Sequence, residues 1–516
     1  MSSRPTKTSS TTCPSSADTI SVILNDTIIV ILNDTIIVIL NEVKNLYTDT
    51  IVAPATIPGT GAISIVRISG PECFRIVDAV VQLKSGTVSD AAAYTIHYGT
   101  VWAGKSVLDD VLVSVFRAPH SYTGEDAAEI STHASSYIVS ELVRMLLEAG
   151  ARFAEPGEFT RRAFLNGKMD LAQAEAVADV ISSTTSASHR VAMNQLKGGF
   201  SVQLGTLRGE LLEMASLLEL ELDFSEEDVE FADRSKLTAL LDATIAHVDT
   251  LAASFRQGNM IKNGVPVAIV GAANAGKSTL LNALTGEERA IVTDIPGTTR
   301  DTIEEVINLD GILFRFIDTA GLRESSDTVE KMGIERTFLK LSQAEIVLAL
   351  LDASLPEIDL LNNLDLVLHH VDFASQKLVI VLNKVDLLGD AERNKIVSAF
   401  NNIVSLVDNK VDVVLISAKQ EKGLAELKKL LVRSEKDLIP DEDSTFVTNI
   451  RHFEALKDAS AALRNCRTSL SRNIPSDLVA EDLRRALSSI NAILGTDLLD
   501  PEEILHTIFR NHCIGK

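Results

Sequence analysis

The sequence predicts a multidomain protein of the α/β and α classes. An N-terminal α+β domain is followed by an α-helical domain, and a mixed sheet flanked by helices is inserted in that helical domain. At 516 residues the chain is long enough for about three domains. Apolar strands that end in glycine-rich or polar loops recur between residues 263 and 436. Patterns of helical period lie on both sides of that region, which indicates the insertion.

The first 48 residues differ from the rest of the chain because one octamer is repeated. Asp18–Asn25, Asp26–Asn33 and Asp34–Asn41 are successive copies. Three copies are too few for a solenoid, and the apolar stretches are β-prone. The stretch lacks the small-residue cleavage site that a signal peptide requires. We expect residues 1–48 to be disordered or to reflect a misassigned start, without a function.

The α+β domain is expected over residues 49–166. Residues 50–52 and 62–68 predict strands, and residues 136–149 predict a helix.

Helical segments are expected over residues 167–262 and 437–516, on either side of the inserted domain at 263–436. In the first, apolar side chains recur on one helical face, at Leu211, Ala215, Leu218 and Leu222. We expect the two segments to pack together, which would couple the state of the inserted domain to helix position.

Composition and charge restrict the possible functions. The net charge of −23 comes from 71 acidic and 48 basic residues, and it argues against a broad nucleic-acid-binding face. The sequence leaves open the alternative of a local basic patch formed by Arg161, Arg162 and Lys168. No apolar run reaches the length of a membrane span. The four cysteines form no C-x-x-C pair, so neither a zinc site nor a disulfide scaffold is indicated, and a cytoplasmic protein is expected.

Five short segments, in order, predict a guanine-nucleotide site. The first, Gly271–Ser278, matches G-x-x-x-x-G-K-[ST] between an apolar strand at 267–270 and a helix at 278–284. Its backbone N–H groups can surround phosphate oxygens at the positive end of that helix. Lys277 would reach the β- and γ-phosphates, and Ser278 would bind Mg²⁺.

The second and third segments are Gly297-Thr298-Thr299 and Asp318-Thr319-Ala320-Gly321. Asp318 ends an apolar strand, where open α/β sheets bind ligands, and it can hold Mg²⁺ directly or through water. Thr299 would close over the metal, and the N–H of Gly321 can sense the γ-phosphate.

The fourth and fifth segments are Asn383-Lys384-Val385-Asp386 and Ser417-Ala418-Lys419. Asp386 can accept hydrogen bonds from two guanine donors that adenine lacks. Asn383 and Lys384 would brace the loop and cover the base. A turn or a helix cap would explain each segment alone, but not all five together.

Two features leave alternatives open. Leu322 stands where many switch GTPases carry the glutamine that orients water, and Arg323, Glu324, Asp327 and Glu330 are alternative groups that spacing alone does not separate. Near the C-terminus, Cys513 is either incidental or a thiol activated by its surroundings.

Beyond these segments, the chain resembles the MnmE (TrmE) family of tRNA modification GTPases from about residue 49 to the C-terminus. The resemblance is carried by motifs outside the nucleotide segments as well as by those segments. These outer motifs are Asp49–Ala53, Thr123–Asp126, Pro156–Lys168, Asp170–Asp179 and Cys513–Lys516.

The resemblance implies a Ras-like P-loop GTPase domain that dimerises across a K⁺ ion. It implies an N-terminal domain that binds a tetrahydrofolate derivative, the 5,10-methylene or 5-formyl form, and forms a homodimer. With the flavoprotein MnmG (GidA), which carries FAD, the family forms a heterotetramer. That complex adds an aminomethyl or carboxymethylaminomethyl group to C5 of the wobble uridine of certain tRNAs. The tRNA is expected to bind largely through the partner.

The resemblance also implies residue roles. The catalytic set is Glu330, which would orient water, with Lys277 and Cys513. Folate contacts would be Arg67, Glu129, Lys168 and Lys516. Mg²⁺ would take Ser278 and Thr299, and K⁺ would take Asn274, Thr293, Ile295 and Thr298. Nucleotide contacts are expected at Asn274, Ala275, Gly276, Lys277, Ser278, Thr279, Thr293, Asp294, Ile295, Pro296, Gly297, Thr298, Thr299, Asp318, Thr319, Ala320, Gly321, Asn383, Lys384, Asp386, Ser417, Ala418 and Lys419.

The chain departs from the family pattern at three places near these sites. His133-Ala134-Ser135 stands where His-Gly-Gly is usual, and His512 stands where phenylalanine usually precedes the terminal cysteine. The phosphate loop begins Gly-Ala-Ala-Asn at residue 271, where Gly-x-Pro-Asn is common.

Two other functions compete with this one. The first is an RNA- or ribosome-assembly switch without modification chemistry, which usually carries a basic RNA-binding domain. The second is a folate enzyme with a regulatory GTPase.

Overall fold

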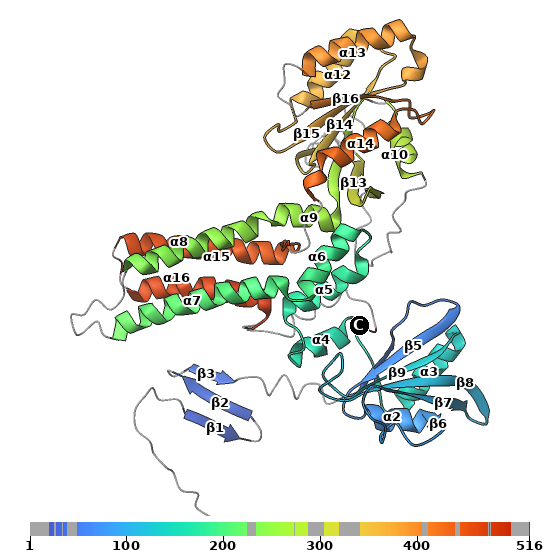
Figure 1. Ribbon diagram of the computed structural model, residues 1–516, viewed down its shortest axis with the longest axis vertical. Helices are drawn as coiled ribbons and strands as arrows, with labels where there is room; N and C mark the ends of the chain where they lie inside the picture. The colour runs from blue at the N-terminus through green and yellow to red at the C-terminus, as the bar shows by residue number, and fades with distance from the viewer. Residues whose placement is uncertain are drawn as a thin grey trace, which may run out of the picture. The chain divides into compact units, whose positions relative to one another are not determined.

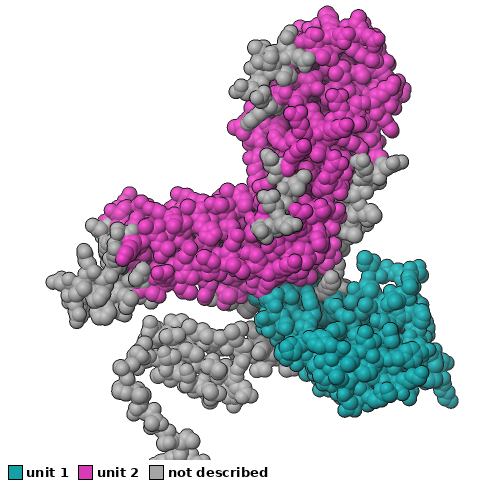
Figure 2. Space-filling view, viewed as in Figure 1, with its two compact units in different colours: residues 1–169, 512–516 teal, residues 170–511 magenta. Residues whose placement is uncertain are grey.

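The computed structural model describes residues 20–24, 27–32, 35–38, 49–223, 234–272, 274–286, 304–318, 341–404, 411–438, 444–472, 474, 476–496 and 515. The chain divides into two compact units (Figure 2). The first comprises Met1–Met169 with His512–Lys516, and the second comprises Asp170–Asn511. The last five residues, predicted to belong to the second helical segment, therefore cluster with the first unit.

A small antiparallel sheet occupies the repeat region. Its strands are β1 (Ile20–Leu24), β2 (Thr27–Leu32) and β3 (Thr35–Val38). Leu24 pairs with Thr27 and Leu32 pairs with Thr35, so two residues connect each pair of strands. Each of these strands is a run rich in β-branched residues from one octamer, a composition that favours strands. The expectation of disorder for residues 1–48 stays a prediction. The misassigned start stays a prediction.

The rest of the first unit is built on a seven-stranded sheet. The sheet order is β10-β4-β5-β9-β8-β7-β6, and only β10 pairs in parallel with its neighbour. The strands are β4 (Ile51–Pro54), β5 (Gly61–Ser69), β6 (Val81–Leu83), β7 (Thr95–Ala103), β8 (Ser106–Phe116), β9 (Ala127–Ala134) and β10 (Arg152–Phe153).

Helices cover this sheet unequally. Helices α2 (Cys73–Val80) and α3 (Ser136–Glu148) pack against one face in a single core. At β4 a second small core contains Phe159 of α4 (Glu158–Leu165). The predicted α+β class is confirmed, and most of the face opposite α2 and α3 keeps exposed side chains, among them Tyr98 and Leu112.

The second unit contains the helical domain. Its helices are α5 (Leu171–Ser182), α6 (Ser186–Leu196), α7 (Gly199–Asp223), α8 (Arg234–Ala253), α9 (Phe255–Asn263), α15 (Ile450–Ser471) and α16 (Ser476–Leu494). Leu211 and Leu218 of α7 share a core with Leu463 of α15 and Ile490 of α16. The predicted packing of the two helical segments is therefore confirmed.

The inserted domain has a six-stranded sheet of order β12-β13-β11-β14-β15-β16, in which only β12 is antiparallel. Its strands are β11 (Val265–Val270), β12 (Glu304–Leu309), β13 (Ile312–Asp318), β14 (Ile346–Asp352), β15 (Lys377–Asn383) and β16 (Val411–Leu415). Its helices are α10 (Lys277–Thr285), α12 (Glu357–Leu368), α13 (Asp390–Val404) and α14 (Leu424–Ser434), with short 3₁₀ turns η1 (Val385–Leu387) and η2 (Lys436–Leu438).

Both faces of this sheet are buried, as near-continuous apolar strands require. Helices α10 and α14 cover one face, and α12 and α13 cover the other (Figure 1). The predicted mixed sheet flanked by helices is confirmed. The loops that follow β11, β13 and β15 leave the carboxyl ends of parallel strands, which is where such sheets bind ligands.

The inserted domain is joined to the helical domain by packed side chains. Met260 and Ile261 of α9 belong to the core of the inserted domain. A Cβ placed at Gly258 would lie 2.3 Å from the carbonyl oxygen of Val447, so the entering and returning segments are in direct contact. Within the described residues, no helix is both long and apolar enough to cross a membrane.

Candidate functional site

The loop between β11 and α10 has the geometry of a phosphate-binding loop. Gly276 has a φ of +104° and Asn274 a φ of +66°, which are values that glycine and asparagine adopt at low cost. Ser278 and Thr279 are exposed in the first turn of α10, where backbone N–H groups attract anions. The Nζ of Lys277 donates to the carbonyl oxygens of Gly271 and Ala272, at 2.8 and 3.1 Å, and so lies over the loop.

Asn383 connects three of the predicted segments. Its Nδ2 donates to the carbonyl oxygen of Ala275 at 2.8 Å, and its Oδ1 accepts from the backbone N–H of Ala418 at 3.0 Å. The side chain is buried at the end of β15. The phosphate loop, the Asn383–Asp386 loop and the Ser417–Lys419 loop are therefore held together.

The residues expected around the base lie beside this connection. Lys384 has a φ of +65°, and its Nζ lies 2.6 Å from Asp352 at the end of β14. Asp386 is half-buried, and a hydrogen bond from Ser417 lowers its pKa, so its carboxylate is available as an acceptor. Asp352 was not predicted, although it ends an apolar strand, which is the pattern that predicted Asp318.

Several predicted residues lie outside the described part of the chain. These are Thr293, Asp294, Ile295, Pro296, Gly297, Thr298, Thr299, Thr319, Ala320, Gly321, Glu330, Cys513 and Lys516. Asp318 is the last residue of β13 and pairs in parallel with Ile269 of β11.

A second site lies in the first unit, around Arg67 on β5. Its Nε and NH2 donate to Oε1 of Glu129 at 2.9 and 2.7 Å, and its NH1 donates to the carbonyl oxygen of Gly515 at 3.1 Å. The rings of Tyr122 and Phe159 lie 5.4 and 5.7 Å from the guanidinium carbon. Arg67 thus joins a second predicted folate residue, Glu129, to the C-terminal tail, and two aromatic rings lie near its guanidinium.

Gly515 fits tightly against β4. A Cβ at this position would lie 2.2 Å from the carbonyl oxygen of Pro54, and its φ of +96° also favours glycine. Lys168, another predicted folate residue, donates instead to the carbonyl oxygen of Pro119 at 2.9 Å. The aromatic residues were not predicted, although Tyr122 immediately precedes the Thr123–Asp126 motif.

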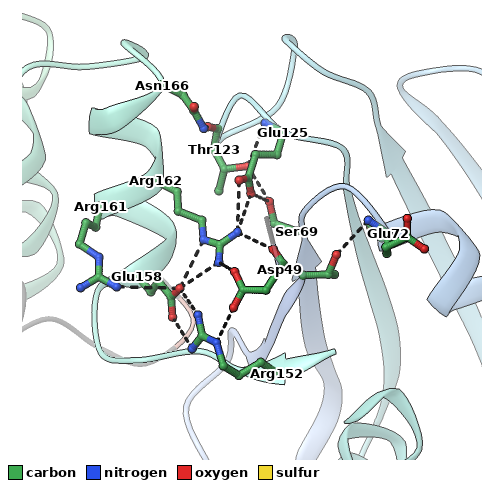
Figure 3. A network of polar contacts seen from close by, with 12 residues as sticks. Asp49, Ser69, Glu72, Thr123, Glu125, Arg152, Glu158, Arg161, Arg162 and Asn166 are labelled. Atoms are coloured by element: carbon green, nitrogen blue, oxygen red, sulfur yellow. Dashed lines mark hydrogen bonds and ion pairs between the residues drawn. The ribbon is translucent and has the colours of Figure 1, made fainter. Parts of the chain in front are cut away.

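Next to this site is a buried network of charges (Figure 3). The Arg162 side chain is 1% exposed, and its guanidinium nitrogens lie 2.6 Å from Asp49, 3.0 Å from Glu158 and 3.2 Å from Glu125. Arg152 pairs with both Asp49 and Glu158. The open alternative of a basic patch through Arg161 and Arg162 is wrong, since both are buried and matched by carboxylates.

The carboxylates of this network differ in the direction of their pKa shifts. Burial tends to raise the pKa of Asp49, but hydrogen bonds from Arg152 and Arg162 outweigh it and lower the pKa. Burial raises the pKa of Glu125 in spite of Arg162 nearby. The Oε2 of Glu125 accepts from the hydroxyl of Ser69 at 2.8 Å, two residues along β5 from Arg67.

The described cysteines are not reactive thiols. Cys73 and Cys466 are free and buried, and burial raises the pKa of both, that of Cys466 to about 12. A raised pKa leaves little thiolate at neutral pH.

Together the inserted sheet, the phosphate loop and the Asn383–Asp386 loop define a P-loop GTP-binding protein. The helical domain matches the family description "MnmE helical domain" over residues 171–513, and the first unit matches "GTP-binding protein TrmE N-terminus" over residues 50–168. The chain belongs to the MnmE (TrmE) family.

Curated relatives agree with this assignment. The protein named tRNA modification GTPase MnmE from Bacteroides fragilis strain YCH46 is 48% identical over 91% of this chain and 99% of the relative. The protein of that name from Bacteroides thetaiotaomicron is 47% identical over the same shares. Among solved structures, Aquifex aeolicus Era bound to GDP·AlF4⁻ is 26% identical over 38% of this chain and 66% of that chain. Its TM-score is 0.27, so the fold assignment rests on the strand order instead.

Proposed function

We propose that this chain is a K⁺-stimulated GTP hydrolase that acts in the modification of tRNA. With a flavoprotein of the MnmG type, it would add an aminomethyl-type group to C5 of the wobble uridine. The observation that carries this proposal is the contact of Arg67 with both Glu129 and Gly515. It brings the C-terminal tail onto the N-terminal domain, in a family whose curated relatives are named tRNA modification GTPases.

The residues of the nucleotide loop fit the expected cations. The hydroxyl of Ser278 is exposed in the first turn of α10 and can contribute an oxygen ligand to Mg²⁺. The side chain of Asn274 is exposed at the loop and offers a carbonyl oxygen for K⁺. A monovalent cation there would add positive charge beside the phosphates, as an arginine finger does in other GTPases.

The Arg67 site fits a tetrahydrofolate derivative. Glu129 and Arg67 offer a carboxylate and a guanidinium, and Tyr122 and Phe159 offer aromatic faces for a flat heterocycle. When bound, the folate supplies the one-carbon unit. Cys513, two residues before Gly515, would meet that unit as a nucleophile, and Lys168 and Lys516 would contribute charge at the edges of the site.

The proposal also includes a homodimer and a complex with the flavoprotein, which would carry FAD and hold most of the tRNA. Size-exclusion chromatography with light scattering tests both assemblies. A chain that stays monomeric, alone and with the flavoprotein, would contradict this part.

Mass spectrometry of tRNA nucleosides tests the function directly. In cells without redundant enzymes, deletion of the gene should remove the C5 modification of the wobble uridine, and residues 49–516 should restore it. Restoration by that shortened chain would also show that the repeat sheet is dispensable. If the modification persists after deletion, the RNA-assembly function takes its place, and GTP-dependent co-sedimentation with ribosomes is the measurement to make next.

Two substitutions separate the activities. Cys513→Ser should abolish modification and leave GTP hydrolysis intact, because the thiol belongs to the tail. Glu330→Ala should keep GTP binding and lose hydrolysis, because it removes the proposed water-orienting group. Normal modification in the first variant, or normal turnover in the second, would refute the respective role.

A further inference from the structure

The last residue of β14, Asp352, holds the side chain of Lys384 in the loop expected around the base. The Nζ of Lys384 donates to Oδ2 of Asp352 at 2.6 Å. The Asp352 side chain is 14% exposed and that of Lys384 is 32% exposed. Solvent therefore screens this pair less than it screens an ordinary surface pair, in which both side chains are mobile.

Asp352 is itself held by a neighbour in sequence. Its Oδ1 accepts the backbone N–H of Ser354 at 3.1 Å and the hydroxyl of Ser354 at 2.6 Å, and its Oδ2 accepts from Lys384. Burial tends to raise the pKa of Asp352, but hydrogen bonds from Lys384 and Ser354 outweigh burial and lower the pKa. The carboxylate is therefore ionised at neutral pH and supplies a fixed negative charge.

The backbone on both sides of Lys384 is fixed as well. The carbonyl oxygen of Asn383 accepts the N–H of Ala353 at 2.9 Å. The carbonyl oxygen of Val385 accepts from Nε and NH2 of Arg393 at 2.9 and 2.6 Å. Lys384 has a φ of +65°, a left-handed conformation that is unfavourable for a residue with a Cβ. The freedom that remains at this position is that of the long side chain, which the carboxylate at the end of β14 restrains.

A restrained lysine side chain at this place favours the binding of a purine nucleotide. We expect Lys384 to cover the face of the base, whereas Asp386 accepts hydrogen bonds at the edge of guanine. A free lysine side chain loses much of its rotamer freedom when a ligand orders it, and that loss weakens binding. Because the ion pair with Asp352 orders the side chain in advance, the loss on binding is smaller.

We propose that Asp352 is a positioning residue of the nucleotide site, which holds Lys384 across the face of the bound purine. It acts through the lysine, without contact with the ligand, and it contributes to the affinity for the nucleotide. Its contribution depends neither on the edge of the base, which Asp386 recognises, nor on the γ-phosphate, where hydrolysis occurs. The inference rests on the nucleotide-binding part of the function proposed above and not on the tRNA chemistry.

Titration with fluorescent analogues of GDP and IDP tests this role, because IDP lacks the exocyclic amine that Asp386 is expected to bind. Asp352→Asn turns a charge-assisted hydrogen bond into a neutral one, so the Kd for GDP should rise roughly tenfold. The Kd for IDP should rise by the same factor. Asp386→Asn should instead lower the preference for GDP over IDP. The same lowered preference in Asp352→Asn would mean that the whole loop has moved, and it would overturn the proposal.

A double-mutant cycle tests whether Asp352 acts through the lysine. Lys384→Met removes the ammonium and keeps an unbranched side chain, and it should raise the Kd for GDP at least as much as Asp352→Asn does. The double variant should bind GDP no more weakly than Lys384→Met alone, because the carboxylate then has no lysine to hold. Additive losses would mean that Asp352 acts by another route, and they would refute the positioning role.

The kinetics of GTP hydrolysis separate positioning from catalysis. Asp352→Asn should raise KM for GTP roughly tenfold and leave kcat at saturating GTP unchanged. The reason is that Lys384 makes the same contacts with the base in the ground state and in the transition state. A fall in kcat without a rise in KM would assign Asp352 to the chemical step and contradict the proposal.

The matched control is Glu357→Gln on α12, which removes an exposed ion pair with Lys395 in the same domain. It should bind GDP as wild type does. Should Asp352→Asn fail to fold, Ser354→Ala replaces it, because this change removes the hydroxyl that holds the carboxylate. Ser354→Ala should raise the Kd for GDP and IDP by one common, smaller factor, and an unchanged Kd would count against the proposal.

The wild-type chain distinguishes failure of this inference from failure of the proposed function. If the wild-type chain binds no GDP, the proposed GTP hydrolase is refuted, and the role of Asp352 falls with it. If the wild-type chain and Asp352→Asn bind GDP equally well, only the role of Asp352 is refuted.

Discussion

The side-chain amide of Asn383 donates to the carbonyl oxygen of Ala275, 108 residues earlier in the chain. Its oxygen holds the backbone N–H of Ala418. Since the side chain is only 3% exposed, water cannot replace either bond when it is lost. One residue therefore determines the relative positions of the phosphate loop and the loops expected around guanine.

Asn383→Ala should weaken nucleotide binding without unfolding the domain. It leaves the N–H of Ala418 and the carbonyl of Ala275 unsatisfied, at about 1–3 kcal/mol for each buried group, so the Kd for GDP should rise about 10- to 100-fold. Titration with a fluorescent GDP analogue measures this. Asn394→Ala, at an exposed position on α13, is the control and should bind as wild type. An unchanged Kd for Asn383→Ala would show that the loops hold their positions without it.

Gly258→Ala should disrupt the junction between the helical and inserted domains. The new Cβ would lie 2.3 Å from the carbonyl oxygen of Val447, so α9 or the returning segment must shift. We expect a lower thermal midpoint and a changed rate of GTP hydrolysis. Gly205→Ala, a helical glycine with nothing within 4 Å, is the matched control and should stabilise the chain by roughly 0.5–1 kcal/mol. Equal thermal midpoints for Gly258→Ala and Gly205→Ala would contradict the close contact between Gly258 and Val447.

Arg67→Met should release the C-terminal tail from the first unit. It removes the charge-assisted hydrogen bond to Gly515, worth about 1.5–3 kcal/mol, so the undocked population should rise roughly 10- to 100-fold. Carboxypeptidase removal of the last residues, followed by mass spectrometry, measures it. Arg144→Met, which removes an arginine 52% exposed on α3, should leave the cleavage rate unchanged. Equal cleavage in both variants would mean that the tail is held by other contacts.

The helical domain should lose stability in acid because of Glu175. This carboxylate, 9% exposed, lies 2.6 Å from Nε2 of His452 and 3.0 Å from Nε of Arg451. Burial tends to raise its pKa, but these two partners outweigh burial and lower the pKa to about 2. A lowered folded-state pKa gives stability that is complete above the ordinary value of 4.5 and is lost as pH falls toward 2.

Urea unfolding at pH 7 and at pH 3 measures this dependence. Glu175→Gln should reduce the loss of unfolding free energy between pH 7 and pH 3. At pH 7 it should destabilise the chain by about 3–5 kcal/mol, because it breaks a buried ion pair. Asp242→Asn, at an exposed pair with Arg467 in the same bundle, is the control. It should leave the urea midpoint unchanged. A steep acid loss that persists in Glu175→Gln would assign the effect to other groups.

Local patterns predicted the inserted domain well and the charged residues poorly. Strands such as β15 were predictable because consecutive apolar residues are typical of a strand buried on both faces. The pairing of Arg67 with Glu129 depends on the register of β5 against β9, which a single sequence does not show. Arg162 was misread because side-chain type does not reveal burial, and its partner Asp49 is 113 residues away.

Residue 67 is translated early and residue 515 late, yet the two are in contact in the folded chain. A ribosome completes the P-loop domain while the tail is still untranslated, so nascent chains can bind nucleotide before the tail reaches Arg67. A premature stop within the last few codons would release a protein that hydrolyses GTP but cannot form that contact. For the same reason, an affinity tag fused after Lys516 would be placed beside Arg67, and purification tags belong at the other end of the chain.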